Sequence, residues 1–167
     1  MALNSEHGLK QIAILRDRFG EKCMIGAGTA ISVDLAKAAI GAGAQFLLTP
    51  GTPIDVLQYC AKKDIMLLPG VFTPGDVATS LEFGYKTMKL FPAGCAPKGY
   101  LKALKGPYDE ANYIAIGGVT IDNINDYFKE GYMGVGLASN LMPLSVLKDK
   151  NWDLGVSYVQ KYVSRVK

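Results

Sequence analysis

Six short apolar runs recur along the chain at intervals typical of one strand plus one helix. Their starts lie about 20 to 27 residues apart, and most of them end at or just before glycine, proline or threonine. The runs cover residues 23–26, 45–49, 65–68, 87–91, 113–116 and 133–137. Because they are almost continuously hydrophobic, they are typical of parallel strands covered on both faces. The pattern therefore predicts alternating strands and helices with right-handed crossovers.

The segments between these runs carry signals for the start and end of helices. Hydroxyl residues that precede a proline or an acidic first turn are predicted N-caps, namely Thr52, Thr73 and Thr120. Glycines predicted to end helices stand at positions 43, 84 and 131. Ser5 is the predicted cap of an opening helix, whose apolar stripe consists of Leu9, Ile12, Ala13 and Leu15. A last helix is expected near residues 152–166.

Two architectures fit this order of elements. One is an open, doubly wound sheet, and the other is part of a (β/α)8 barrel. The chain has 167 residues, enough for one domain covering 1–167, whereas a complete barrel usually needs at least about 200. The pattern by itself leaves the two architectures open. In both of them a ligand site lies beyond the carboxyl ends of the strands.

Composition excludes several classes of function. Hydrophobic residues make up 49% and charged residues 20%, and the net charge of +3 is scattered along the chain. This distribution gives no basic patch for nucleic acid and no charged face for a membrane. Three cysteines without CxxC spacing and one histidine, His7, argue against a disulfide framework and against a metal site. Without a recognisable signal peptide or membrane span, we expect a cytoplasmic protein.

Lys89 stands out among the strand residues. Side chains alternate along a strand, so Met88 and Leu90 share one face and Lys89 points to the other. If Met88 and Leu90 pack under a helix, Lys89 turns inward, where desolvation lowers the pKa of its ammonium group. A neutral lysine amine can attack a carbonyl carbon and form a Schiff base. The alternative is a lysine with a buried stem and a solvated head.

Glycines follow the last two predicted strands. Gly117 and Gly118 precede Thr120, and the segment 136–139 has a similar place after the next strand. Glycine turns at strand ends let backbone N–H groups converge on an anion, and in barrels the loops after the last two strands commonly bind phosphate. The alternative is that these glycines only make tight turns with positive φ.

Taken in order, these segments resemble the 2-keto-3-deoxy-6-phosphogluconate (KDPG) aldolase family, which includes 4-hydroxy-2-oxoglutarate (KHG) aldolase activity. The segments that carry the resemblance are 26–29, 46–51, 69–74, 89–93, 117–120 and 139–143. The resemblance implies a (β/α)8 barrel, usually trimeric, and metal-free class I aldolase chemistry through a Schiff base, with no cofactor. The implied ligand is a small 2-keto acid or sugar phosphate.

The resemblance also implies roles for individual residues. Lys89 matches the Schiff-base lysine. Positions matching the substrate pocket are Thr29, Pro50, Thr73, Phe91 and Pro92. Positions matching the phosphate site are Gly117, Gly118 and Ser139. In such an enzyme the C3–C4 bond of KDPG breaks to give pyruvate and glyceraldehyde 3-phosphate, and KHG gives pyruvate and glyoxylate.

The chain departs from the family pattern at its start. The first strand and helix and the second strand have no counterpart, and the family's acid/base glutamate aligns immediately before Met1. We therefore expect an incomplete barrel of about six parallel strands, with edges covered by another subunit or by rearranged N-terminal residues. Ile116 and Asn4 replace a threonine and an arginine that commonly contact substrate.

These departures keep a second function open, a catalytically impaired or non-catalytic homologue that binds a phosphorylated metabolite. A sugar-phosphate epimerase or synthase fits less well, because such enzymes need acids, histidines or a metal at the strand ends, and this sequence supplies none there.

Overall fold

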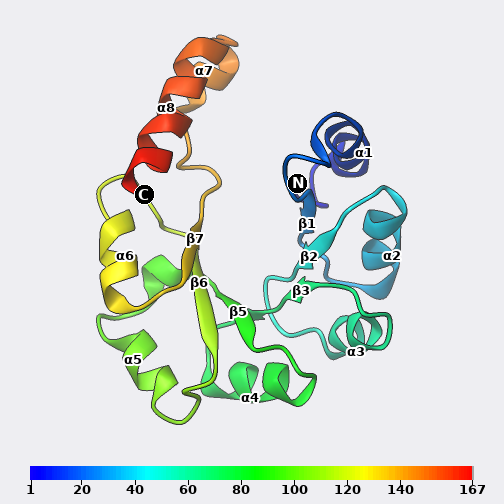
Figure 1. Cartoon of the computed structure of the whole chain (residues 1–167), viewed down its shortest axis with the longest axis vertical. Coiled ribbons are helices and arrows are strands. Elements are labelled where there is room, and N and C mark those ends of the chain that lie inside the picture. Colours follow the sequence, from blue (N-terminus) through cyan, green and yellow to red (C-terminus); the bar gives the residue numbers. More distant parts are fainter. Residues whose placement is uncertain (167) are drawn as a thin grey trace. The chain divides into compact units, whose positions relative to one another are not determined.

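The computed structural model describes residues 1–166. The chain divides into two compact units, Met1–Lys89 and the part that begins at Leu90, and each is described by itself. Strands and helices alternate in both, and each of the six predicted runs contains strand (Figure 1). The run after residue 65 is interrupted at Pro69, so it contributes two short strands, β3 and β4. The predicted alternation of strands and helices is confirmed.

The first unit contains five strands and four helices among its described residues. The strands are β1 (Gly26–Gly28), β2 (Phe46–Leu48), β3 (Leu67–Leu68), β4 (Gly70–Val71) and β5 (Thr87–Leu90), whose last residue begins the second unit. The helices are α1 (Gly8–Phe19), α2 (Val33–Gly41), α3 (Ile54–Lys62) and α4 (Pro74–Glu82). Strands β1, β2 and β3 pair in parallel in that order.

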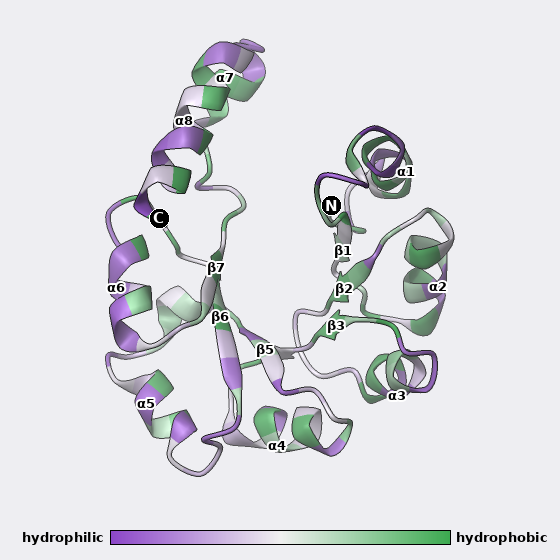
Figure 2. Cartoon of the chain, viewed as in Figure 1, coloured by the Kyte–Doolittle hydropathy of each residue, from purple (hydrophilic) through white to green (hydrophobic). Residues whose placement is uncertain are grey.

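The core of the first unit lies between these strands and their helices. Leu47 of β2 is fully buried, as are Ala36 and Ala39 of α2, and the small alanines let the helix lie close to the sheet. Helices α1, α2 and α3 follow one side of β1, β2 and β3 in Figure 1. Figure 2 shows β2 and β3 in the colour of hydrophobic residues, as expected for strands covered by helices.

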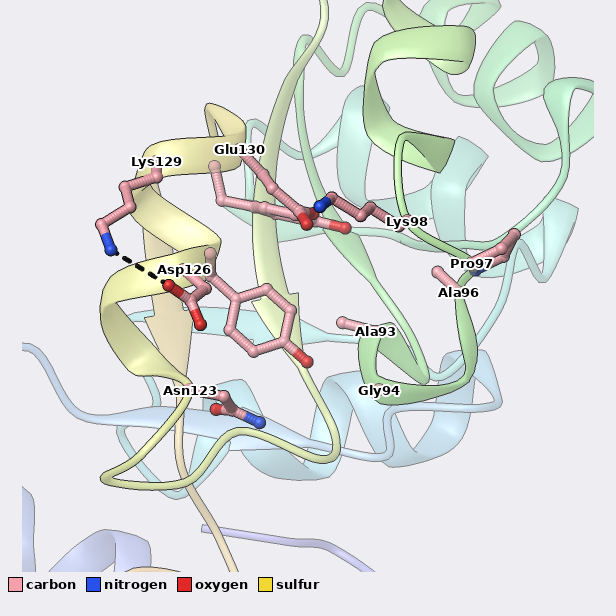
Figure 3. A pocket seen from close by; sticks show the side chains of 11 residues that line it. Ala93, Gly94, Ala96, Pro97, Lys98, Asn123, Asp126, Lys129 and Glu130 are labelled. Atoms are coloured by element: carbon pink, nitrogen blue, oxygen red, sulfur yellow. Dashed lines mark hydrogen bonds and ion pairs between the residues drawn. The ribbon is translucent and has the colours of Figure 1, made fainter.

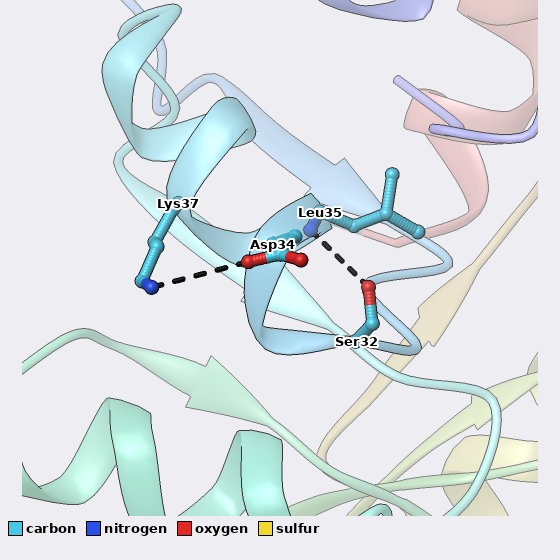
Figure 4. A network of polar contacts seen from close by, with 4 residues as sticks. All are labelled: Ser32, Asp34, Leu35 and Lys37. Atoms are coloured by element: carbon cyan, nitrogen blue, oxygen red, sulfur yellow. Dashed lines mark hydrogen bonds and ion pairs between the residues drawn. The ribbon is translucent and has the colours of Figure 1, made fainter.

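Local chemistry explains where several of these helices begin. Ser32 caps α2 by accepting a hydrogen bond from the Leu35 backbone N–H (3.3 Å), and Asp34 in the first turn lies 3.9 Å from Lys37 (Figure 4). Thr73 caps α4 as predicted, with Pro74 as the first helical residue. The predicted stops are also confirmed, because Gly43, Gly84 and Gly131 all have positive φ just after a helix.

Three predicted caps are wrong. The Thr120 hydroxyl accepts from the Asn123 N–H (3.4 Å), but helix α6 (Ile124–Glu130) has Asn123 at its N-cap and no side-chain cap. Helix α1 begins at Gly8, and the Ser5 hydroxyl donates to the Ala2 carbonyl (2.7 Å) instead of capping the helix. Helix α3 has Pro53 at its N-cap and no side-chain cap, and the Thr52 hydroxyl donates to Asp76 (3.2 Å). Of the predicted stripe on α1, only Ile12 is buried. In each of the three cases the N-cap lies one to three residues after the predicted residue, at His7, Pro53 and Asn123.

The first residues of the chain lie along β1. Ala2 forms a parallel bridge with Gly28, and the Leu3 N–H donates to the Gly28 carbonyl (2.9 Å). The Gly28 N–H in turn donates to the Met1 carbonyl (2.7 Å). These bonds satisfy backbone groups at the edge of β1 that would otherwise be unpaired. This agrees with the expectation that N-terminal residues cover an edge.

The second unit holds the remaining elements. They are η1 (Ala93–Cys95), α5 (Tyr100–Lys105), β6 (Asn112–Ile116), α6 (Ile124–Glu130), β7 (Gly134–Gly136), α7 (Leu144–Lys148) and α8 (Trp152–Arg165). Strands β6 and β7 pair in parallel, with Ile114 opposite Gly134 and Ile116 opposite Gly136. Tyr113 and Ala115 of β6 point the other way and are fully buried. Among residues 1–166, we find no helix with the length and apolarity needed to cross a membrane.

Candidate functional site

Lys89 is buried, as the alternation along its strand predicts. The residue is only 9% exposed, while Met88 and Leu90 on either side are completely buried. The Lys89 backbone N–H donates to the Pro69 carbonyl (2.8 Å), which holds the end of β5 beside the interruption between β3 and β4. Burial lowers the pKa of the Lys89 ammonium group because the charged form loses hydration. At a given pH, a larger fraction of Lys89 is therefore in the neutral amine form than for a lysine at the protein surface.

The loops of the first unit are joined at Thr49, a residue that sequence reasoning did not single out. Its side chain is fully buried, donates to the Gly51 carbonyl (2.6 Å) and accepts from the Gly70 N–H (3.1 Å). A side chain at Gly70 would collide with the backbone of Thr49 and Pro50. Pro50, a predicted pocket residue, is thus positioned by backbone packing against β4. The sequence signal that could have identified Thr49 was its position at the end of an apolar run.

Thr29 adopts an unusual backbone conformation. Its φ is +66°, in the left-handed region that β-branched residues avoid. The Ala30 N–H donates to the Leu48 carbonyl (3.1 Å), so the turn that contains Thr29 is tied to the end of the next strand. Strain of this kind persists only where surrounding contacts fix it, and it is common at ligand sites. The structure thus places Thr29 at the carboxyl end of β1, where a ligand site was predicted.

Thr73 lies at the start of α4 with its hydroxyl already engaged. The hydroxyl accepts from the Asp76 N–H (3.3 Å), and the Thr73 backbone N–H donates to Asp76 Oδ2 (2.8 Å), which together make a capping box. The hydroxyl also donates to Asp76 Oδ2 (2.8 Å). Asp76 also accepts from the Phe72 N–H (3.0 Å) and from Thr52 (3.2 Å). Burial by itself would raise the pKa of Asp76, but these hydrogen bonds outweigh it and hold the pKa below its usual value. Sequence reasoning missed Asp76, although an acid three residues after Thr73 is the local signal of a capping box. Only its bond to Thr52 depends on a distant segment.

Asp76→Asn is expected to lower the free energy of unfolding by about 1–2 kcal/mol at neutral pH. Because the folded-state pKa of Asp76 is depressed, its stabilisation is present above the unfolded pKa of roughly 4 and is lost as the pH falls through the folded value. The difference in the free energy of unfolding between the wild-type and Asp76→Asn proteins should therefore become smaller at acidic pH. Urea unfolding at several pH values measures it. Asp34→Asn, in the first turn of α2, is the control, and an equal loss there would contradict the assignment.

The glycine pair of the second unit packs against the segment that follows β5. Gly117 and Gly118 have φ of +88° and +85°, and the Gly94 N–H donates to the Gly117 carbonyl (2.8 Å). A Cβ at Gly117 would lie 3.1 Å from the Phe91 ring and 3.2 Å from Pro92. A Cβ at Gly118 would lie 2.8 Å from the Gly94 Cα. The predicted residues Phe91, Pro92, Gly117 and Gly118 are therefore brought together in this unit.

Ser139 is exposed in the segment that follows β7. Its neighbour Asn140 donates from its side-chain amide to the Val119 carbonyl (3.2 Å), and the Tyr162 hydroxyl donates to the Asn140 carbonyl (2.7 Å). These bonds hold the Ser139 segment beside the residues that follow the glycine pair. Ser139 and Thr120 line one cavity of about 420 Å³. Ile116 lies over Gly136, where an added Cβ would be 2.7 Å from Ile116 Cγ1.

Another pocket of the second unit is lined by none of the predicted site residues. It has a volume of about 600 Å³ and is lined by η1, the residues after it and α6 (Figure 3). Lys129 donates to Asp126 (3.2 Å) at its rim, and Lys98 and Glu130 also face it. Lys89 and the glycine pair do not line this pocket, so the volume of a pocket alone does not identify the site of the predicted chemistry. Among the described residues, no group of three acidic, histidine or cysteine side chains could hold a metal ion.

Comparison with known proteins supports a relationship over nearly the whole chain. The family model described as "KDPG and KHG aldolase" matches residues 1–157. A 2-dehydro-3-deoxy-6-phosphogalactonate aldolase from Escherichia coli (strain K12) is 31% identical over 162 residues, which cover 96% of this chain and 78% of the relative. A 2-dehydro-3-deoxy-phosphogluconate aldolase from Pseudomonas aeruginosa is 32% identical, over 91% of this chain and 69% of the relative.

Solved structures give the same result. A KDPG aldolase from Legionella pneumophila, with pyruvate captured as a covalent carbinolamine intermediate, superposes with a TM-score of 0.87 at 29% identity. The match covers 95% of this chain and 77% of that one. The predicted (β/α)-barrel type is thereby confirmed over the open doubly wound sheet. The chain belongs to the KDPG and KHG aldolase family, the carbon–carbon lyases of class I, and has their TIM-type α/β fold.

Proposed function

We propose that this chain cleaves a 4-hydroxy-2-keto acid to pyruvate and an aldehyde, with Lys89 as the residue that forms the Schiff base. The substrate is KDPG, KHG or both. The observation that carries the proposal is the burial of Lys89 at the end of β5, with its pKa lowered by desolvation. A covalent pyruvate intermediate in the Legionella pneumophila aldolase supports it.

The chemistry follows from an amine of this kind. The neutral Lys89 Nζ attacks C2 of the keto acid, water leaves, and a protonated imine forms. When the C4 hydroxyl gives its proton to a water molecule, the C3–C4 bond breaks and its electron pair moves to the imine, giving an enamine of pyruvate and a free aldehyde. The enamine takes a proton at C3, and water then hydrolyses the imine to release pyruvate and restore the lysine. Water added and water lost balance over the cycle.

The substrate-contacting positions that the family resemblance implies are proposed for each unit by itself. In the first unit these are Thr29, Pro50 and Thr73, and in the second they are Phe91 and Pro92. The engaged hydroxyl of Thr73 can still accept a further hydrogen bond, because a hydroxyl oxygen has two lone pairs. The strained turn at Thr29 supports a role there.

We propose separately that the second unit binds phosphate through Gly117, Gly118 and Ser139. The positive φ of both glycines and the exposed position of Gly118 and Ser139 support an anion-binding turn. This part of the proposal stands apart from the lysine chemistry, since a substrate such as KHG has no phosphate. We also propose a homotrimer on the basis of the family resemblance.

Gly118→Ala is expected to raise the KM for KDPG at least about tenfold and to leave the KM for KHG nearly unchanged, because only KDPG presents a phosphate. The added methyl would displace the turn from Gly94. Gly99→Ala is the matched control, since Gly99 has φ of +83° but open space around it. If Gly118→Ala fails to fold, Ser139→Ala tests the same point. Equal increases for both substrates would contradict the phosphate assignment.

Pyruvate release tests the function itself. The purified chain is incubated with KDPG and, separately, with KHG, and pyruvate is followed by lactate dehydrogenase and NADH. Release above the uncatalysed rate from either substrate supports the aldolase, and the ratio of kcat/KM values gives its preference. Binding of the sugar phosphate in a calorimeter without any pyruvate release would instead favour a non-catalytic, phosphometabolite-binding protein.

A further inference from the structure

Two successive peptide groups in the turn after β6 are held by their carbonyl oxygens. The Gly117 carbonyl accepts from the Gly94 N–H (2.8 Å), and the Gly118 carbonyl accepts from Asn123 Nδ2 (2.9 Å). In a trans peptide group, the carbonyl and the N–H of the next residue point in opposite directions. The two bonds therefore direct the N–H groups of Gly118 and Val119 away from the segments that hold the turn.

These two N–H groups are free to donate to a ligand. Neither makes a hydrogen bond to any of the residues that the structure describes. Val119 is only 2% exposed, and the N–H groups of buried residues are nearly always paired, so an acceptor is expected here. Gly118 is exposed, and its φ of +85° suits the curved backbone in which successive N–H groups bind an anion. The turn is therefore suited to hold a phosphate group.

The side chain of Asn123 holds this turn at two points. Besides the bond from Nδ2 to the Gly118 carbonyl, its Oδ1 accepts from the Thr120 N–H (2.7 Å). One planar amide thus joins the peptide group before Val119 to the peptide group after it. Thr120 makes a return contact, because its hydroxyl accepts from the Asn123 backbone N–H (3.4 Å). Neither peptide group can rotate without breaking a hydrogen bond to this side chain.

A second asparagine bonds the same turn. The Asn140 side-chain amide donates to the Val119 carbonyl (3.2 Å), so the peptide group between Val119 and Thr120 has both of its polar atoms bonded. Asn123 lies on the carbonyl side of the turn, where it also lines the pocket of about 600 Å³ beside α6 (Figure 3). An anion on the N–H side therefore contacts the turn and not the Asn123 side chain.

We propose that Asn123 is a positioning residue for phosphorylated substrates, which directs the Val119 N–H toward the phosphate by holding the Gly118 carbonyl. The inference rests on the phosphate site proposed above and adds to it a residue that does not touch the ligand. Without the Asn123 amide, the Gly118 carbonyl loses its donor, and the peptide group between Gly118 and Val119 is free to rotate. A substrate without phosphate, such as KHG, does not depend on this alignment.

Asn123→Ala is expected to weaken the binding of glycerol 3-phosphate at least about fivefold, because a hydrogen bond to a charged group is strong only when it is aligned. Glycerol 3-phosphate carries a phosphate but no keto group, so calorimetry measures this site without turnover. Asn125→Ala is the matched control and should bind as the wild type does. Asn125 is also a partly exposed residue near the start of α6, and its side chain makes no hydrogen bond within the described part of the chain. In turnover, Asn123→Ala should raise the KM for KDPG and leave kcat and the KM for KHG unchanged.

Asn123→Asp separates positioning from packing, because it keeps the shape of the side chain. Its ionised carboxylate can accept from the Thr120 N–H but cannot donate to the Gly118 carbonyl, whereas the protonated carboxyl group can do both. The dissociation constant of this variant for glycerol 3-phosphate, divided by that of the wild type at the same pH, should therefore fall as the pH is lowered toward about 4. A ratio that does not change with pH would mean that the side chain only fills space, and the proposal would be wrong.

The outcomes separate this inference from the proposed function. If the wild-type chain does not bind glycerol 3-phosphate, the phosphate site is wrong and the role of Asn123 is wrong with it. If the wild type binds and Asn123→Ala binds equally well, or if the KM values for KDPG and KHG rise equally, only the role of Asn123 is overturned. A chain that releases no pyruvate overturns the lysine chemistry but leaves the calorimetric test in force. If circular dichroism shows that Asn123→Ala does not fold, the pH dependence of Asn123→Asp decides.

Discussion

Lys89→Met is expected to reduce pyruvate release at least about 1,000-fold, because the reaction then has no amine to form the imine. Methionine has similar length and volume and suits a buried position, so the fold should remain intact. Lys89→Arg is the charged control. It preserves a cation at the site but cannot form a Schiff base, since guanidinium stays protonated. Both variants should be inactive, which separates the loss of the amine from the loss of positive charge.

Covalent trapping locates the amine independently of turnover. Incubation with pyruvate and borohydride should add one reduced pyruvyl group to the wild-type chain, and peptide mass analysis should place it on Lys89. Burial lowers the pKa of Lys89, so trapping should increase with pH at lower values than the roughly 10.4 of a free lysine side chain. Lys129→Met, at an exposed lysine, should trap normally. An adduct of equal yield in Lys89→Met would overturn the assignment.

Gly70→Ala is expected to be the most destabilising single-methyl substitution in the first unit, by roughly 2–4 kcal/mol in the free energy of unfolding. The added Cβ would lie 2.5 Å from the Pro50 carbonyl oxygen and 2.6 Å from that of Thr49. Both contacts are to backbone, so no side chain can rotate away. The displacement would also weaken the hydrogen bond from the Gly70 N–H to the Thr49 hydroxyl.

Two further variants separate the parts of this effect. Gly51→Ala is the matched control, because nothing lies within 4 Å of its added Cβ. Thr49→Val keeps the volume but removes the hydroxyl, leaving the Gly70 N–H without its acceptor, and should cost roughly 1–3 kcal/mol. Denaturant unfolding measures all three. If Gly70→Ala were as stable as Gly51→Ala, the loop after β2 would move away from the added methyl group at little cost in free energy, and the prediction would be wrong.

The strands and the burial of Lys89 follow from short-range patterns. The apolar runs mark the strands, because burial on both faces needs residues that are hydrophobic at successive positions. Alternation along β5 is sufficient to turn Lys89 away from the face shared by Met88 and Leu90. The capping of α4 is equally local, since Thr73, Pro74 and Asp76 lie within one turn.

What could not be predicted depends on partners distant in the sequence. The Thr52 hydroxyl donates to Asp76, 24 residues away, and α3 has Pro53 rather than Thr52 at its N-cap. Gly70 is required because the backbone of Pro50 passes against it, and Gly26 because the Phe46 ring lies over it. No local pattern reports such contacts. The role of Thr49 between two loops was invisible for the same reason.

The Asp76 carboxylate makes two loops of the first unit sensitive to acid together. One carboxylate accepts hydrogen bonds from Thr52, in the loop after β2, and from Phe72 and Thr73, in the loop after β4. When this carboxylate takes up a proton, both loops lose an acceptor in the same event. Loosening of the two segments should therefore be concerted, so that the start of α3 and the start of α4 become accessible to a protease together.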